Sequence, residues 1–164
     1  MTEVGKRAIL AAVEDLATAT TVAVETARVA MEQQATDVVL LHVLDQHTVM
    51  GAVFGMSGYC APVQETIEEG EALLTLAEGA MRAEFEACNQ PAPAIRHEVA
   101  EGDVASAIQL VAEEQQVETI VLGARRPRAF GRLVHPDVRS HIVEHGARRV
   151  HVASLQEAAP IVRG

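Results

Sequence analysis

The stretch that decides the fold runs from Thr119 to His145 and has the sequence TIVLGARRPRAFGRLVHPDVRSHIVEH. A short apolar run ends at Gly123, an arginine-rich segment follows, and a helical pattern begins near His135. This order predicts a strand, a glycine turn, a cationic loop and a helix N-terminus, with which α/β proteins bind anions beyond the carboxyl end of a strand. The stretch therefore predicts an α/β fold with a candidate anion site at Arg125 and Arg126.

Four other segments have the pattern of strands. Residues 8–13 (AILAAV) and 37–44 (DVVLLHVL) are almost wholly apolar, which is typical of strands buried on both faces. Residues 95–99 and 149–154 alternate between apolar and polar side chains, which is typical of half-exposed strands. Helices are predicted at 17–34, at 64–88 with an apolar seam from Ile67 to Cys88, after a cap at Asp103, and at 136–145.

Strands that alternate with helices predict a single doubly wound parallel sheet with helices on both faces. The three uniformly apolar strands belong in its centre and the two alternating ones at its edges, which gives the order 3-2-1-4-5. This order places a switch point, where ligands bind in such folds, between the first and fourth strands, next to Glu14 and Gly123. We expect one domain over residues 1–154 and a frayed tail over residues 155–164.

Composition limits the classes of function. The 164 residues are 49% hydrophobic and 22% charged, enough for one domain with a sizeable core. Aromatic residues make up 2% and the formal net charge is -10, which argues against binding to nucleic acid or to anionic membranes. Without an apolar leader or a bilayer-length segment, we expect a cytoplasmic protein in which Cys60 and Cys88 are free thiols.

Residues 45–63 have no steady hydrophobic period and contain three glycines among methionine and aromatic side chains. This pattern predicts a long loop, and loops of such length in a compact domain are often functional. A flap over the switch point, a surface for a partner protein and an ordinary packed loop all remain open, as does the role of Cys60 within it.

Over essentially its whole length, the sequence resembles the universal stress protein (UspA) family. The resemblance rests on ILAAVED, LLHVLD, EGDVASAI, TIVLGAR and VEHGARRVHVAS, in this order and spacing. It implies the five-stranded sheet derived above, a stress-linked binding or regulatory role, and a homodimer in which the last strand pairs across a twofold axis. The residues of that strand are Arg149, Val150, His151 and Val152.

One branch of this family binds ATP through the signature Gly-x2-Gly-x9-Gly-Ser/Thr, and this chain departs from it. The first glycine falls on Gly123, but the second falls on Arg126, the third on Pro136 and the hydroxyl residue on Asp137. Family positions outside this signature match more closely. Val13, Val43 and Val138 are close matches, Val43 being the residue whose backbone faces adenine, and Glu14 stands where the family has aspartate.

The departures have physical consequences at the predicted helix. Pro136 lacks an N–H that could donate to phosphate, although proline is a good first helical residue. Asp137 places a negative charge where the triphosphate would lie, and the helix dipole favours it by about 0.3–1 kcal/mol. We interpret Asp137 as a built-in substitute for phosphate, paired with Arg125 or Arg126. Alternatively, the arginines hold a smaller anion, or form a solvated loop.

No motif points to catalysis or to a metal. The sequence H-x-x-E-H at 141–145 lacks the further downstream ligand that a zinc protease needs. The sequence therefore predicts a universal stress protein-type regulatory or binding protein without the family's ATP binding, in which weak nucleotide hydrolysis stays open. The alternatives are an adenine-nucleotide-binding protein, for ATP or AMP, with a modified arginine-rich phosphate loop, and a protein-interaction module that acts through residues 45–63.

Overall fold

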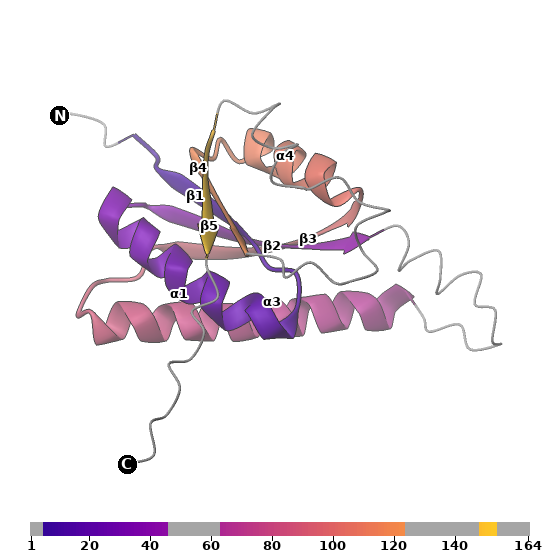
Figure 1. The fold of residues 1–164 in the computed structure, drawn as a ribbon, viewed down its shortest axis with the longest axis horizontal. Helices are drawn as coiled ribbons and strands as arrows, with labels where there is room; N and C mark the ends of the chain where they lie inside the picture. The colour runs from indigo at the N-terminus through magenta and orange to yellow at the C-terminus, as the bar shows by residue number, and fades with distance from the viewer. Residues whose placement is uncertain (1–4, 46–62, 124–147, 154–164) are drawn as a thin grey trace, which may run out of the picture.

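The computed structural model describes residues 5–45, 63–123 and 148–153 (Figure 1). The five strands form one sheet in the order β3-β2-β1-β4-β5, and each neighbouring pair is parallel. This confirms the predicted fold and strand order. In chain order the elements are β1 (Ala8–Ala12), α1 (Leu16–Gln33), β2 (Asp37–Asp45), α3 (Val63–Ala87), β3 (Ala94–Gly102), α4 (Val104–Glu114), β4 (Thr119–Gly123) and β5 (Arg149–Ala153).

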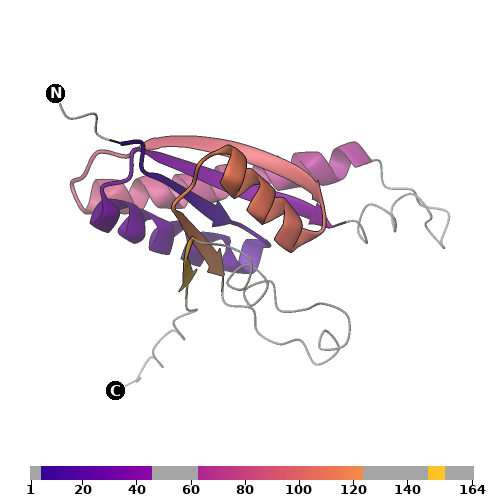
Figure 2. The ribbon, with the colours of Figure 1, turned by 90° about the horizontal axis from the view of Figure 1, so that it is seen from above.

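Helices cover both faces of the sheet. Helices α1 and α3 lie side by side on one face, and α4 lies on the other (Figures 1 and 2). The central strands are apolar at successive positions because each face meets a helix layer. Ile9 and Leu40 pack into the core on the side of α1 and α3, whereas Leu10 and Leu41 pack with Ile108 of α4.

Element boundaries agree with the predictions to within a few residues. Strand β3 extends from Ala94 to Gly102 and so is longer than the predicted 95–99, because it pairs with β2 along the whole length of both strands. Asp45 still belongs to β2 and Val63 already belongs to α3. The rest of the predicted loop, residues 46–62, lies outside the described residues, as do the predicted helix at 136–145 and the tail.

The apolar seam of α3 is correct for most of its length. Leu74, Met81 and Phe85 are buried against the sheet. The prediction that Cys88 continues this seam was wrong, since the helix ends at Ala87 and Cys88 is exposed in the turn that follows. Among the described residues, no helix combines the length and the apolar character that crossing a membrane requires.

Candidate functional site at the switch point

Strands β1 and β4 are parallel neighbours in the sheet, so their carboxyl ends lie at the same end of it. Val13 and Glu14 directly follow β1, and Gly123 is the last residue of β4. Strand β2 continues beyond its last pair with β1, so the half-buried Val43 lies beyond the end of β1. The structure thus brings Val13, Glu14, Val43 and Gly123 to the same end of the sheet, at its switch point.

Gly123 lies against the first turns of α1. A Cβ atom at this position would lie 3.2 Å from Cγ2 of Val22 and 3.6 Å from Cβ of Thr18. The contact with Val22 is tighter than ordinary van der Waals packing, so glycine lets the end of β4 approach the helix closely. A packing role therefore accounts for Gly123, whether or not the segment after it binds a ligand.

A carboxylate from the chain itself caps α1. Asp15 Oδ1 accepts hydrogen bonds from the Thr18 amide at 2.9 Å and from Thr18 Oγ1 at 2.8 Å. This satisfies one of the backbone donors that a helix N-terminus leaves free, with a typical gain of about 1 kcal/mol. This cap was not predicted from the sequence, although the spacing Asp-x-x-Thr just before a helical pattern is a recognisable signal.

Helix α4 begins in the same way. Asp103 Oδ2 accepts from the Ser106 amide at 3.0 Å and from Ser106 Oγ at 2.8 Å, which confirms the predicted cap. Both α1 and α4 start at the carboxyl end of the sheet. At each of these two N-termini, an aspartate occupies the position to which the helix dipole would attract an anion.

A second residue missed at the sequence level, His42, lies beside the predicted site. Its Nδ1 is 2.8 Å from the carbonyl oxygen of Val13, and its ring packs on Gly70 of α3. The available signal was a polar residue in an otherwise apolar stretch of strand. Four predicted site residues, namely Arg125, Arg126, Asp137 and Val138, lie outside the described residues, so their roles stay predictions.

The edge strand β5 carries the predicted dimer residues. Arg149 is exposed, and Val150 packs against the core on the α4 side. His151 lies on the opposite face, where its Nε2 is 2.7 Å from Glu25 Oε1 of α1. Val152 is half-buried. The strand is thus held to the body of the protein through one edge and both faces.

A similar pair joins the other edge strand, β3, to α3. His97 Nε2 lies 2.6 Å from Glu78 Oε2, and Arg82 Nη2 lies 2.7 Å from Glu78 Oε1. Burial raises the pKa of Glu78, but the hydrogen bonds and positive charges of Arg82 and His97 outweigh it and lower that pKa below its ordinary value. These contacts serve to hold the sheet edge.

Metal chemistry has no support in the described part of the chain. Among residues 5–45, 63–123 and 148–153, no three His, Cys, Asp or Glu side chains are grouped as a metal site would require.

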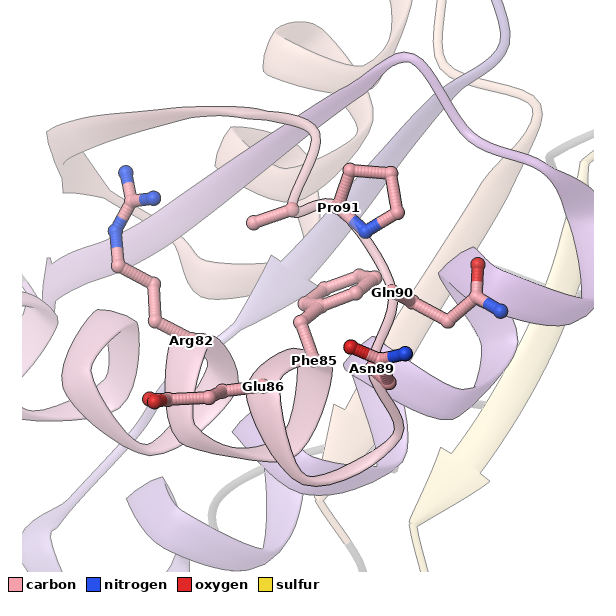
Figure 3. A pocket seen from close by; sticks show the side chains of 7 residues that line it. Arg82, Phe85, Glu86, Asn89, Gln90 and Pro91 are labelled. Atoms are coloured by element: carbon pink, nitrogen blue, oxygen red, sulfur yellow. The ribbon is translucent and has the colours of Figure 1, made fainter.

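Two surface hollows in the described part of the chain lie at the other end of the sheet. One, of about 470 Å³, is bordered by the end of α3 and the segment that leads into β3; Figure 3 shows Phe85 between α3 and Pro91. A neighbouring hollow of about 530 Å³ includes Met31 and Cys88. Both lie where α1 and α3 end, at the amino end of the sheet. They are therefore separate from the switch point.

Comparison with known proteins identifies one family by sequence and by structure. A sequence model of the Universal stress protein family matches residues 6–154. Universal stress protein UspA from Lactobacillus plantarum has 25% identity and a TM-score of 0.55, with 92% of this chain and 99% of that chain covered. A universal stress protein family member from Burkholderia pseudomallei has 22% identity and a TM-score of 0.62, with 92% and 97% covered.

A third solved structure, the universal stress protein from Archaeoglobus fulgidus in complex with dAMP, has 16% identity and a TM-score of 0.59, with 92% and 98% covered. At this identity the similarity establishes the fold alone. No curated protein matches the chain significantly.

Proposed function

The chain belongs to the universal stress protein family, and we propose that it is a binding or regulatory protein of that family which works without the family's mode of ATP binding. The observation that carries this proposal is the use of aspartate at the helix N-termini on the carboxyl end of the sheet. Asp15 and Asp103 each accept two hydrogen bonds from the residue three positions later. A negative charge held there opposes a second anion.

The same spacing occurs twice more in the sequence, at Asp45 and Thr48, where a loop is predicted, and at Asp137 and Ser140, where a helix is predicted. Asp137 is followed three residues later by Ser140, as Asp15 is by Thr18 and Asp103 by Ser106. This repetition supports Asp137 as the N-cap of the predicted last helix, which would then begin after Asp137 and not, as the sequence pattern alone predicts, at Pro136. A capping carboxylate would then occupy the position that a nucleotide phosphate needs, and Arg125 or Arg126 would balance its charge.

A second candidate function is the binding of an adenine nucleotide with a single phosphate. It is favoured by Gly123, Val13 and Val43 at the switch point and by the dAMP in the complex from Archaeoglobus fulgidus. One phosphate needs fewer donors than three, and Arg125 and Arg126 could supply them from the loop. This would give the protein AMP as a ligand while ATP binding is lost.

We further propose that the protein is a cytoplasmic homodimer without enzymatic turnover. Within the described residues the sheet ends at β5, and the backbone groups of an edge strand pair readily with a second strand. Pairing two copies of Arg149–Ala153 around a twofold axis would remove both edges. The boundary at residues 154 and 155 and the partner surface at residues 45–63 stay predictions.

The test is calorimetric titration of ATP, ADP and AMP into the full chain and into Asp137→Ser. We expect no ATP binding to the wild type and a gain of about tenfold or more in the variant, since a repelling charge at a helix N-terminus is replaced by a hydroxyl donor. Asp103→Ser is the matched control, because it removes the same charge from another helix N-terminus and should leave ATP binding unchanged.

Two results would change the assignment. Micromolar ATP binding by the wild type would contradict the self-filled site. Binding of AMP alone, lost in Arg125→Ala and Arg126→Ala, would establish the second candidate instead.

A further inference from the structure

The side chain of His42 holds the end of β1. It is the single polar side chain between Val38 and Leu44, and it is half-buried. Its Nδ1 lies 2.8 Å from the carbonyl oxygen of Val13, the first residue after β1. A carbonyl oxygen can only accept, so Nδ1 must carry the hydrogen in this bond.

This bond takes the place of a bond of the sheet. The Val13 amide still donates to the Leu41 carbonyl at 2.8 Å, as in a regular parallel ladder. In a ladder that continued, the Val13 carbonyl would next accept from the Val43 amide. Within the described residues that bond is not formed, and the paired residues of the two strands end at Ala12 and Leu41. The imidazole has taken the acceptor that Val43 would use.

Helix α3 keeps the imidazole in this position. A Cβ atom on Gly70 would lie 2.8 Å from Cδ2 of His42, closer than real contacts of this kind, so the ring fits because residue 70 is glycine. Gly79, on the same helix, would meet no atom within 4 Å of an added Cβ. The glycine at position 70 thus has a specific packing reason that the one at position 79 lacks.

We propose that His42 is a positioning residue of the switch point. By holding the Val13 carbonyl, it ends the β1–β2 ladder one step early and keeps the Val43 amide from being used within the sheet. Alternate residues of a strand point their amides to the same side, so this N–H faces the end of β1, as the Leu41 carbonyl does. There it can donate to a ligand at the switch point, which in the second candidate function is the adenine base that the family resemblance places at Val43. The ligand part of this proposal, donation from the Val43 amide to a ligand, rests on the second candidate function. The strand-end part, in which His42 ends the β1–β2 ladder, rests on the contacts given above.

The first test needs no ligand. Nitrogen-15 spectra of the imidazole should show His42 with the hydrogen on Nδ1, and a neutral ring with its hydrogen on Nε2 would overturn the proposal. In His42→Phe, which keeps a ring and removes the donor, we expect the ladder to extend. The Val43 amide should then gain a hydrogen bond, and its hydrogen exchange should become slower by up to about fivefold.

Matched variants separate positioning from general stability. His42→Asn can place an amide donor near the site of Nδ1 and should retain the wild-type exchange rate at Val43. Gly70→Ala should displace the ring and behave like His42→Phe, whereas Gly79→Ala should behave like the wild type. Unchanged exchange at Val43 in both His42→Phe and Gly70→Ala would refute the proposal.

Titration of adenosine, which carries no phosphate, tests the ligand part. If the wild type binds adenosine, we expect His42→Phe to weaken binding about fivefold, while His42→Asn and Gly79→Ala retain it. Equal affinity in His42→Phe would refute a role for His42 toward the ligand. Absence of adenosine binding in the wild type would refute the ligand part of this proposal, whereas the AMP titration decides the second candidate function and the exchange rates decide the strand-end role of His42.

Discussion

The carboxyl end and the amino end of the sheet are formed by different kinds of contact. At the carboxyl end, aspartates cap α1 and α4, and Gly123 and His42 make close contacts around the strand ends. At the amino end, the turns that follow the helices contain residues in left-handed backbone conformation, and the buried Phe85 borders a surface hollow. The left-handed residues are Gln34 and Asn89, both with φ of 53°, and Gln116, with φ of 54°.

This difference separates stability from function within one small fold. Close apolar packing tolerates little change in volume, so a buried side chain such as Phe85 contributes strongly to stability. Polar caps and a strand that stops early leave backbone groups that can be redirected. We therefore expect substitutions of buried apolar side chains at the amino end to lower the free energy of unfolding by more than substitutions at the carboxyl end do.

The largest effect on stability should come from Phe85→Ala, at the amino end. Phe85 is 3% exposed and packs in the core shared by α1, α3 and the sheet. Its truncation should lower the free energy of unfolding by about 3–5 kcal/mol, measured by urea denaturation. Leu16, at the carboxyl end, is 69% exposed, and Leu16→Ala should change stability by no more than about 0.5 kcal/mol. Equal losses in the two variants would contradict the expected difference in stability contribution between the two ends of the sheet.

A smaller loss is expected from the caps at the carboxyl end. Asp15→Ala removes the acceptor of two hydrogen bonds from Thr18 and should lower stability by about 1 kcal/mol. Asp103→Ala should have a similar effect, because Asp103 has the same contacts with Ser106. Asp15→Asn keeps a side-chain oxygen that can cap and is the control, with most of the stability retained in urea denaturation. A loss in Asp15→Asn as large as in Asp15→Ala would mean that capping geometry is not what matters.

The fold could be predicted because burial leaves a direct mark on sequence. Residues 8–13 and 37–44 had to be apolar at successive positions once helices covered both faces, and this placed them in the centre. Ile95, His97 and Val99 were expected on one face of an edge strand. They lie there, with Ile95 and Val99 against the core and His97 on Glu78 of α3.

The site could be predicted only as far as topology reaches. Strand order alone brings Val13, Glu14 and Gly123 to one end of the sheet. The bond between His42 and Val13 joins residues 29 positions apart and depends on a ring that fits over Gly70. Contacts of this kind depend on distances between packed elements, and no local spacing in the sequence carries that information.

The smallest effect should separate two neighbouring glutamines at the end of α4. Gln116 has a φ of 54°, which is strained for any residue with a Cβ, whereas Gln115 has a φ of -86° in the right-handed region. Gln116→Gly should therefore raise the free energy of unfolding by about 0.5–1 kcal/mol, since glycine adopts the left-handed conformation without a steric penalty. Gln115→Gly should lower it by a similar amount, because there glycine only adds freedom to the unfolded chain. Opposite signs in urea denaturation would locate strain at the amino end, and a loss in both variants would show that the turn is relaxed and that its glutamine contributes contacts of its own.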